Sequence, residues 1–454
     1  MAPAQSTDAI YAVTAYEDTY VEPLIRSSLT RLIPNLIMIP SLSSLPDPES
    51  KLVQWRQYES IEFDHASCRP EHNVINSYVF RKALIRKHYL ATTVANWLVK
   101  HPNSCLKAHV KEATAFEVDY AEFLDDALVE AWDLKEAMGR NEGCDAIERE
   151  WWILKPGMSE RGQGIRLFSS MEQLEGIFEE WDPESDDEEE ESHDDDDDDA
   201  AHSDDDDMSA RSQSEENGHA QTDEEEGNAG IMTSLLRHFI AQPYIHPPLL
   251  FPAPFESADR KFHIRTYVLA AGAMKVFVYR PMLALFAGQK YVSPGKADAD
   301  DVNDGLSGHL TNTCLQTGQR EGSVHEFWSL PANLAGLPAD WKQNAFKQIC
   351  EVTGEVFEAA ARDMMIHFQP LSHAFEIFGL DYMLDAKGNA WLLEVNSFPD
   401  FAQTGGDLKT LIQELFDNVV QVAIKPQLGL DQHDLGQAGT DKLVKCCDID
   451  LGRR

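Results

Sequence analysis

The sequence lacks any long apolar run and is poor in basic residues. No uninterrupted apolar stretch approaches the roughly 18 residues that a membrane-spanning helix needs, so we expect no transmembrane segment and no membrane partner. The opening MAPAQSTDAIYAV has no basic start followed by an apolar core, and it does not resemble a signal peptide. With 38 Lys and Arg against 78 Asp and Glu, the formal net charge is −40, which argues against sequence-specific DNA binding.

Cysteine is also scarce. Seven cysteines occur in 454 residues, and no two of them are spaced as CxxC. An odd and unpatterned set indicates reduced thiols rather than a disulfide framework, which predicts a cytosolic or nuclear protein, and we expect a cytoplasmic location. The adjacent Cys446 and Cys447 could carry a lipid, but buried or unused thiols are the simpler interpretation.

The negative charge is concentrated in one stretch. Residues 182–226 hold 24 acidic residues and a single arginine, a formal charge of −23, so the other 409 residues carry −17. This stretch has almost no apolar residues and cannot bury enough surface to fold. We therefore expect a disordered acidic insertion over 182–229 between two ordered segments. It either increases solubility or contacts a basic partner, and both roles remain open.

Strand-like and helix-like patterns are mixed along the rest of the chain, which predicts an α+β or α/β fold. Ala9–Tyr16 alternates like a strand, whereas Val79–Val99, 230–239 and 408–424 have helical spacing. We divide the chain into an N-terminal α/β subdomain, a central subdomain, the acidic insertion, a C-terminal subdomain and a C-terminal tail, at 1–72, 73–181, 182–229, 230–425 and 426–454.

A polar pair interrupts an apolar strand near the C-terminus. The stretch FGLDYMLDAKGNAWLLEVN is typical of a β-hairpin, because two apolar runs flank the turn signal AKGN. If Asp385 pairs with Ala390, Asp381 lies opposite Glu394, and Asn396 is two residues further on the same face. Facing carboxylates repel unless a cation lies between them, and Asp, Glu and Asn oxygens suit Mg²⁺. The hairpin therefore predicts a magnesium site formed by Asp381, Glu394 and Asn396.

The alternative is an exposed polar face of the sheet. The assumed register places Met383 and Leu392 on the same face as the two carboxylates. Apolar neighbours argue against free exposure to solvent, which favours the metal interpretation.

Two further segments have features of a nucleotide site. Lys155 ends the strand WWILKP and enters a loop with Gly157, Gly162 and Gly164, where small residues let the backbone approach phosphate. This signal is weak alone, because glycine turns are common. The strand end Gln242–Ile245 could offer backbone groups to a flat heterocycle, although an ordinary strand end is the simpler alternative.

A cationic strand follows in KFHIRTYV. Lys261, His263 and Arg265 alternate with apolar residues and share one face. Lysine and arginine placed together could bind phosphate oxygens and neutralise charge during transfer. The alternative is a solvated cationic face. The loop HLTN, His309–Asn312, adds polar groups downstream.

Taken in order, these segments resemble the tubulin–tyrosine ligase family, which has the ATP-grasp fold, and they are similar to a divergent, fungal-type member. The matching pieces, over 75–425 apart from the insertion, are RKHYL, WILKP…RGQGI, QPYI, KFHIR…VYR, HLTN and FGLDYMLD…WLLEVNSFPDF. The resemblance implies three subdomains with ATP between the central and C-terminal ones. It also implies ligation, in which the γ-phosphate activates a carboxylate as an acyl phosphate and an amine then attacks to form an amide.

The resemblance also implies roles for individual residues around the nucleotide. Lys87 and Lys155 match lysines that contact phosphate. Gln242 and Ile245 match the hinge that holds adenine through backbone groups.

The remaining matches lie at the chemistry. Lys261 and Arg265 match the cationic strand over the phosphates and the acyl intermediate, and we assign catalysis to them. Thr311 and Asn312 match a loop near nucleotide and substrate. The three hairpin residues match the Mg²⁺ ligands. Phosphoryl transfer needs little covalent help, so metal and cations suffice for these roles.

The chain departs from the family pattern on the substrate side. His263 replaces the usual Asp of KFDIR, and Pro243 replaces a lysine that often follows the hinge Gln. Pro281-Met282 stands where the family tends to have EG, and Leu285 stands where an arginine engages the acceptor. The phosphate and metal groups are kept, while an arginine that would pair with a substrate carboxylate is lost.

The leading hypothesis is an ATP- and Mg²⁺-dependent ligase that adds a free amino acid to a protein acceptor. Acidic tubulin tails would be repelled by this acidic chain, so we expect another acceptor. The alternative is a catalytically weak ATP-binding scaffold in the cytoplasm whose acidic insertion recruits a basic partner. A different ATP-grasp ligase with a small-molecule substrate is a third option, which the HLTN and KFxIR pieces disfavour.

Overall fold

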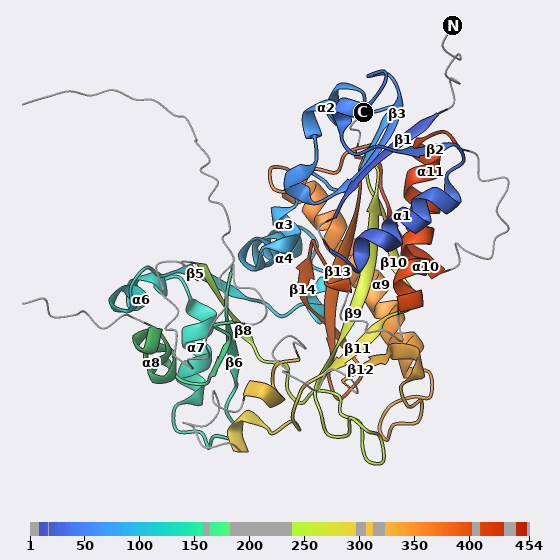
Figure 1. Cartoon of the computed structure of the whole chain (residues 1–454). Helices are drawn as coiled ribbons and strands as arrows, with labels where there is room; N and C mark the ends of the chain where they lie inside the picture. The colour runs from blue at the N-terminus through green and yellow to red at the C-terminus, as the bar shows by residue number, and fades with distance from the viewer. Residues whose placement is uncertain are drawn as a thin grey trace, which may run out of the picture.

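The fold consists of two bodies built on three sheets (Figure 1). In the computed structural model, the described residues are 9–16, 18–157, 163–181, 238–296, 306–311, 323–401, 409–430 and 442–451. The predicted acidic insertion and residues 230–237 of the predicted helix 230–239 lie outside these ranges, as do Gly162 and Asn312. Within the described residues, no helix is long and apolar enough to cross a membrane.

The chain begins with a four-stranded parallel sheet in the order β2-β1-β3-β4, whose strands are Ile10–Ala15 (β1), Leu36–Met38 (β2), Lys51–Arg56 (β3) and Asn73–Ile75 (β4). The predicted strand over Ala9–Tyr16 is therefore present as β1. Its alternating side chains enter two different apolar cores, because parallel strands are covered on both faces.

A seven-stranded antiparallel sheet forms the centre of the larger body. Its central strand β9, Phe262–Ala271, is buried at all ten positions. One edge of β9 pairs with β13, and the other pairs first with β11 and then with β10. The other strands are Lys275–Tyr279 (β10), Leu283–Phe286 (β11), Val324–Glu326 (β12), Phe375–Leu384 (β13), Ala390–Asn396 (β14) and Leu443–Asp448 (β15).

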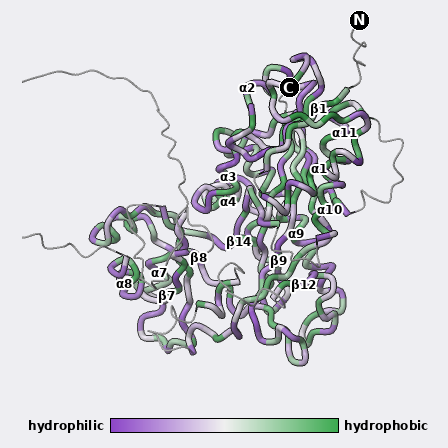
Figure 2. Tube along the Cα trace, in the orientation of Figure 1, coloured by the Kyte–Doolittle hydropathy of each residue, from purple (hydrophilic) through white to green (hydrophobic). Residues whose placement is uncertain are grey.

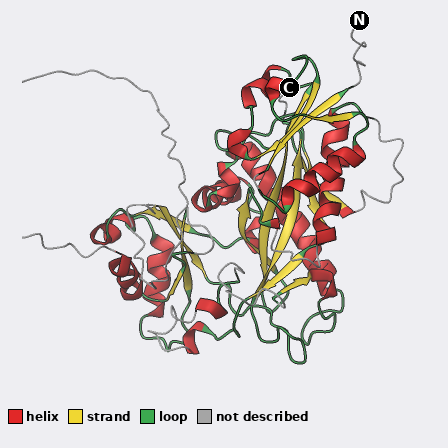
Figure 3. Cartoon of the chain, in the orientation of Figure 1, coloured by secondary structure: helices red, strands yellow, loops and turns green. Residues whose placement is uncertain are grey.

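Helices cover both faces of this sheet (Figure 3). One core contains Trp341–Asp363 (α9) and Lys87–Lys100 (α4), and the opposite core contains Val21–Leu32 (α1) and Lys409–Val419 (α10). The predicted helix over 408–424 is present as α10 and a π-helical turn, Val420–Ile424. Hydrophobic stretches run along the centre of this body (Figure 2). Short helices complete it, namely Phe63–Cys68 (α2), Lys82–Ile85 (α3), Leu106–His109 (α5) and Lys425–Gln427 (α11).

The smaller body is an antiparallel sheet in the order β5-β8-β6-β7, with helices on its outer face (Figure 1). Its strands are Thr114–Glu117 (β5), Trp152–Pro156 (β6), Arg166–Phe168 (β7) and His238–Pro243 (β8), and its helices are Leu124–Ala127 (α6), Trp132–Asn141 (α7) and Met171–Trp181 (α8). Trp152 and Leu154 of β6 enter the core beneath these helices, so the alternate residues of β6 face the larger body.

These bodies do not follow the subdomain boundaries that we drew from the sequence. β8 follows the insertion but pairs with β5 and β6 of the preceding segment, because the insertion interrupts one sheet. α3 and α4 precede β5 but pack in the larger body. The predicted tail, 426–454, contributes β15, which pairs with β10. Its sequence LVKCCD is short and half polar, and so gives little signal of a strand.

The packing of β15 on α9 yields the first test. Gly354 of α9 faces Cys446 so closely that an added Cβ would lie 2.5 Å from the Cys446 carbonyl oxygen. Gly354→Ala should therefore lower the free energy of unfolding by roughly 1–3 kcal/mol, because backbone must move. Gly176→Ala in α8 is the matched control, since nothing lies within 4 Å of its added Cβ. Denaturant unfolding should show the control to be neutral or stabilised by roughly 0.5–1 kcal/mol; equal effects of both substitutions would contradict the packing of β15.

Candidate functional site

The hairpin β13–β14 places Asp381 directly opposite Glu394, as the sequence predicts. The turn, however, pairs Leu384 rather than Asp385 with Ala390, and the register shifts between Asp381 and Tyr382. The expected constant register is wrong, and an extra residue in β14 restores the predicted pairing. Asp385 instead accepts hydrogen bonds from the backbone of the turn, with its Oδ1 2.9 Å from the amide nitrogens of Lys387 and Asn389.

The same irregularity corrects a second expectation. Leu392 pairs with Tyr382, and both enter the core beneath α9. Leu392 therefore does not share a face with the two carboxylates, although Met383 is buried at 3% exposure.

Cations surround the facing carboxylates. Arg265 binds Asp381 through two hydrogen bonds, Nε to Oδ1 at 2.5 Å and Nη2 to Oδ2 at 3.0 Å. Lys87 Nζ lies 3.8 Å from Glu394 Oε2. Asn396 Nδ2 donates to Asp381 Oδ2 at 3.4 Å and to Glu394 Oε1 at 3.3 Å, which joins the three side chains.

The charge of Glu394 follows from these neighbours. Burial alone would raise the pKa of its carboxyl group, but Lys87 and Lys155, with help from Asn396, lower the pKa to about 2. Glu394 is therefore a carboxylate at any physiological pH. Its side chain keeps 31% of its exposure, so one oxygen-rich edge of the cluster is open to a ligand.

The donor chemistry of Asp381, Glu394 and Asn396 fits Mg²⁺. All three can present oxygen, because a half-turn of the Asn396 amide replaces its nitrogen by Oδ1. Glu394 and Asn396 are the more available donors, since Arg265 occupies both oxygens of Asp381. In the described part of the chain, no group of three His, Cys, Asp or Glu side chains is placed to hold a metal ion, so an amide is needed as the third donor.

The three polar residues of β9 point into the protein rather than into water. Lys261, His263 and Arg265 are 3%, 2% and 7% exposed, so the alternative of a solvated cationic face is wrong. Lys261 Nζ donates to the Tyr244 hydroxyl at 2.7 Å, and that hydroxyl lies 2.9 Å from His309 Nδ1. Burial and the charge of Lys155 lower the pKa of Lys261 to about 7.

His263 occupies the centre of this strand face. Its Nδ1 lies 2.6 Å from Thr311 Oγ1, and its Nε2 lies 3.7 Å from Asp381 Oδ1. Burial lowers its pKa, with Asp381 opposing the shift, so His263 is neutral at pH 7. Leu285 pairs with His263 across β9 and β11 and is 1% exposed. Two of the departures from the family pattern, His263 and Leu285, therefore lie beside each other.

The smaller body supplies Lys155 and the strand end after it. Lys155 Nζ donates to Gln242 Oε1 at 3.2 Å, and Gln242 Nε2 donates to the Lys111 carbonyl at 2.9 Å. Burial lowers the pKa of Lys155 to about 8, with Glu394 opposing the shift. Ile245 is buried two residues beyond Pro243. The predicted nucleotide residues thus lie on the face of this sheet that points to the larger body.

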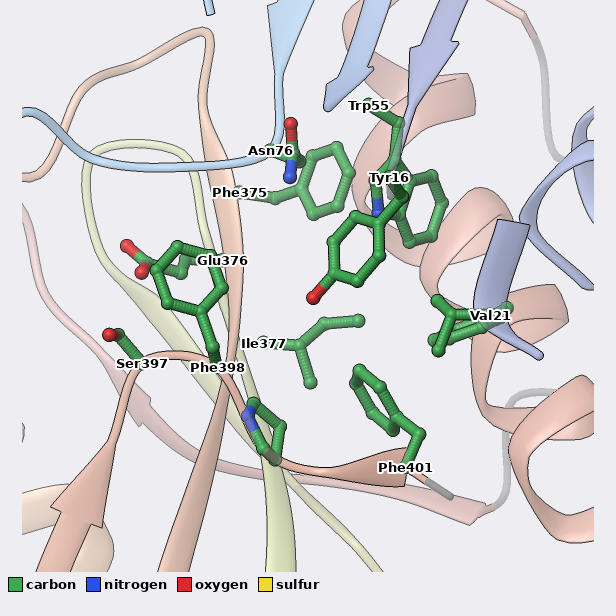
Figure 4. Close-up of a pocket in the computed structure, with 12 residues that line it drawn as sticks. Tyr16, Val21, Trp55, Asn76, Phe375, Glu376, Ile377, Ser397, Phe398 and Phe401 are labelled. Atoms are coloured by element: carbon green, nitrogen blue, oxygen red, sulfur yellow. The ribbon is translucent and has the colours of Figure 1, made fainter. Parts of the chain in front are cut away.

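A small aromatic pocket lies farther along β13 (Figure 4). Tyr16, Phe375 and Phe401 face one another there, whereas the Glu376 carboxylate points away behind Phe398. Its volume of about 20 Å³ has room for one water molecule and not for a nucleotide. The cluster around Asp381 and Lys155 is therefore the candidate site.

Comparison with known proteins supports a family assignment. The model of the tubulin-tyrosine ligase family matches residues 65–432. The chain is 42% identical to a probable tubulin–tyrosine ligase of Schizosaccharomyces pombe over 413 residues, which cover 90% of each protein. It is also 38% identical over 450 residues to the probable tubulin–tyrosine ligase PBY1 of Saccharomyces cerevisiae. That match covers 97% of this chain and 55% of the relative.

The chain belongs to the tubulin–tyrosine ligase family. Its structure is similar to the crystal structure of the C-terminal domain of K. lactis Pby1, described as an ATP-grasp enzyme interacting with the mRNA decapping enzyme Dcp2. That similarity has a TM-score of 0.66 at 33% identity and covers 97% of this chain and 99% of the other. The chain therefore has the ATP-grasp fold.

Some polar contacts of the candidate site could not be predicted from the sequence. Tyr244, whose hydroxyl accepts the hydrogen bond from Lys261, lies in a loop after β8. His309, whose Nδ1 contacts that hydroxyl, comes from a distant turn. Their only signal is a Tyr within QPYI and the first residue of HLTN. Arg265 reaches Asp381 past Gly379, where an added Cβ would lie 3.4 Å from Arg265 Cδ. Thr311 lies beside His263, while Asn312 falls outside the described residues.

The burial of Lys261 predicts a pH dependence. Its pKa falls from 10.5 in the unfolded chain to about 7 in the folded protein, so the unfolded state binds more protons between these values. The free energy of unfolding should therefore rise with pH from 7 to 9. Lys261→Met should remove up to about 2 kcal/mol of this rise in urea titrations. Lys347→Met, at a 76% exposed lysine, is the matched control. Parallel wild-type and Lys261→Met curves would show that Lys261 stays charged in the folded protein.

Proposed function

We propose that the protein is an ATP- and Mg²⁺-dependent ligase that joins a free amino acid to a protein through an acyl phosphate. The observation that carries this proposal is the meeting of buried Lys155, Lys261 and Arg265 with the Asp381–Glu394 pair. Burial makes the charged forms of both lysines unfavourable without a ligand. A polyphosphate would pair with these lysines, and a divalent cation would link it to the facing carboxylates.

The proposed reaction has two displacement steps. A substrate carboxylate oxygen attacks the γ-phosphorus of ATP, the bond from that phosphorus to the bridging oxygen breaks, and ADP leaves. The amine nitrogen then attacks the acyl carbon, phosphate leaves with the bonding electrons, and the nitrogen loses its extra proton. Mg²⁺ bound by Glu394 and Asn396, together with Asp381, would offset the charge of the phosphates.

The cationic residues have separate roles in this proposal. Lys155 and Lys87 bind phosphate oxygens from the two bodies, one from β6 and one from the start of α4. Gln242 and Ile245 hold the adenine, and Thr311 with Asn312 borders nucleotide and substrate. Lys261 and Arg265 stabilise the charge that develops at the transferred group. Arg265 is already oriented by its two hydrogen bonds to Asp381.

The substrate side supports an acceptor other than an acidic tail. Leu285 and His263 leave this part of the site without the arginine and aspartate of the family pattern. The net charge of −40 opposes the approach of another acidic chain. Although the fungal relatives carry the name of tubulin–tyrosine ligases, we propose a neutral or basic acceptor in the cytoplasm.

A second candidate function is an ATP-binding interaction protein with weak catalysis. The observation that favours it is the K. lactis relative, which interacts with the decapping enzyme Dcp2 and covers nearly the whole of this chain in structure. In this alternative, nucleotide stabilises the two bodies, and an exposed surface or the acidic insertion binds the partner.

The metal assignment predicts the behaviour of Glu394→Gln. Saturating Mg-ATP at 100 times its Kd should stabilise the wild type by roughly 3 kcal/mol, and the variant should lose this gain, because a neutral amide holds Mg²⁺ weakly. Thermal unfolding with ATP alone and with Mg-ATP measures the difference. Glu351→Gln, at a 52% exposed position of α9, is the control for the charge change. An unchanged Mg-ATP shift in Glu394→Gln would remove Glu394 from the metal site.

Labelled amino acids decide between the two functions. The full chain, ATP, Mg²⁺ and lysate from the source cells are incubated with each labelled amino acid, and proteins are separated on a denaturing gel. A ligase should label discrete bands with wild type and none with Glu394→Gln. Lysate without ATP is the second control. Binding of Mg-ATP without any labelled band would favour the interaction protein and contradict the ligase.

A further inference from the structure

The hydroxyl of Tyr267 in strand β9 is a buried donor without an acceptor. The tyrosine is 0% exposed, and its hydroxyl oxygen has no hydrogen-bond partner among the residues that the structure describes. Burial raises the pKa of Tyr267, with Arg265 opposing the shift, so the group stays protonated and can donate. An unsatisfied buried hydroxyl costs free energy and is rare in folded proteins, so it indicates a contact that a ligand completes.

Tyr267 continues the polar face of β9 beyond Arg265. Side chains alternate along a strand, so Tyr267 shares a face with Arg265 and the two polar residues before it. Tyr267 pairs with Gly379 of β13, and Gly379 pairs with Asn396 of β14. The tyrosine therefore lies in the same row of the sheet as one of the predicted metal ligands, with a residue that has no side chain between them.

The two ends of this face differ in what they can bind. Lys261 donates to the Tyr244 hydroxyl within the predicted adenine hinge, so the base of the nucleotide belongs at the Lys261 end. Arg265 and its partner Asp381 mark the phosphates and the metal. In phosphoryl transfer the attacking and leaving oxygens lie roughly in line, so a substrate carboxylate approaches from the side opposite ADP. That side is the Tyr267 end of the face.

The segment that follows the metal ligand Asn396 covers Tyr267. The Phe401 ring stacks on the tyrosine ring, with 5.4 Å between their centroids. Pro399 crosses Gly379 so closely that an added Cβ on the glycine would lie 2.8 Å from the proline Cβ. Phe401 also borders the small aromatic pocket (Figure 4), so a space of about 20 Å³ lies beside it. A shift of this segment would uncover the hydroxyl next to Asn396.

We propose that Tyr267 is a substrate-contact residue that binds the carboxylate to be activated, an inference that rests on the proposed ligase function. Its O–H donates to the carboxylate oxygen that does not attack, and this oxygen becomes the carbonyl oxygen of the acyl phosphate. Negative charge develops on the same oxygen when the amine attacks, and a donor aimed at it stabilises the transition state. Arg265, the preceding residue on this face, binds the phosphoryl group.

An analogue of the acyl phosphate tests this contact without turnover. Acetonylphosphonate carries a carbonyl and a phosphoryl group joined by CH2, whereas propylphosphonate lacks the carbonyl. With Mg-ADP, acetonylphosphonate should stabilise the full chain in thermal unfolding, and Tyr267→Phe should weaken its apparent affinity roughly three- to tenfold, because one hydrogen bond is lost. The affinity for propylphosphonate should be the same in both proteins. An equal effect on the two phosphonates, or no binding of acetonylphosphonate to the wild type, would overturn the proposal.

Tyr279→Phe is the matched control. Tyr279 lies in the same core, but its hydroxyl donates to the Leu411 carbonyl at 3.2 Å. This variant should keep the affinity for acetonylphosphonate, and its Tm should fall by roughly 1–3 °C with the lost hydrogen bond. Tyr267→Phe should leave the Tm unchanged or raised, because it removes an unsatisfied hydroxyl. A fall as large as that of the control would mean that the Tyr267 hydroxyl is already bonded within the protein and would overturn the proposal.

Amino-acid labelling separates this proposal from the ligase itself. Wild type and Tyr279→Phe should label the same bands, whereas Tyr267→Phe should label them roughly 100-fold more slowly with an unchanged Mg-ATP shift. Labelling by Tyr267→Phe at the wild-type rate would overturn the contact and leave the ligase standing. Carbonyl-dependent binding that requires Tyr267, without any labelled band, would support the contact and contradict the ligase.

Discussion

The structure of the candidate site depends on one unfavourable contact, the approach of Asp381 and Glu394 across a hairpin. Two carboxylates at directly opposite positions repel, so the surrounding strands must supply positive charge. Arg265 of the neighbouring strand supplies it to Asp381, and Lys87 at the start of α4 supplies it to Glu394. The central sheet and helix α4 are thereby tied to one small cluster.

Much of this cluster could be predicted from sequence, because its key pairing is local. The turn signal AKGN lies between the two strands, so a short-range rule brings Asp381 opposite Glu394. The rule succeeded despite a wrong register at the turn, because the irregularity at Tyr382 compensates for it. Side-chain capping by Asp385 sets that register, and no alternation pattern shows it.

The non-local parts could not be predicted in the same way. The mixed fold follows from periodicity, but the return of β8 to a sheet begun more than a hundred residues earlier does not. The contact of Lys261 with Tyr244 joins two bodies, and the pairing of His263 with Thr311 joins a strand to a loop. Each depends on how finished elements pack, which is information that a single sequence does not contain. The same packing buries the polar face of β9, for which a solvated cationic face was the alternative interpretation.

The last strand has a consequence for work with shortened chains. β15 is at the edge of the central sheet and pairs only with β10 in the described structure, along Lys275–Tyr279. Without it, the backbone N–H and C=O groups of β10 would form a new open edge beside a hydrophobic core. Such an edge is a template for pairing with another molecule, so trimming the chain before Leu443 would promote aggregation. The segment that we predicted to be a tail therefore covers this edge of the sheet and prevents further strand pairing there.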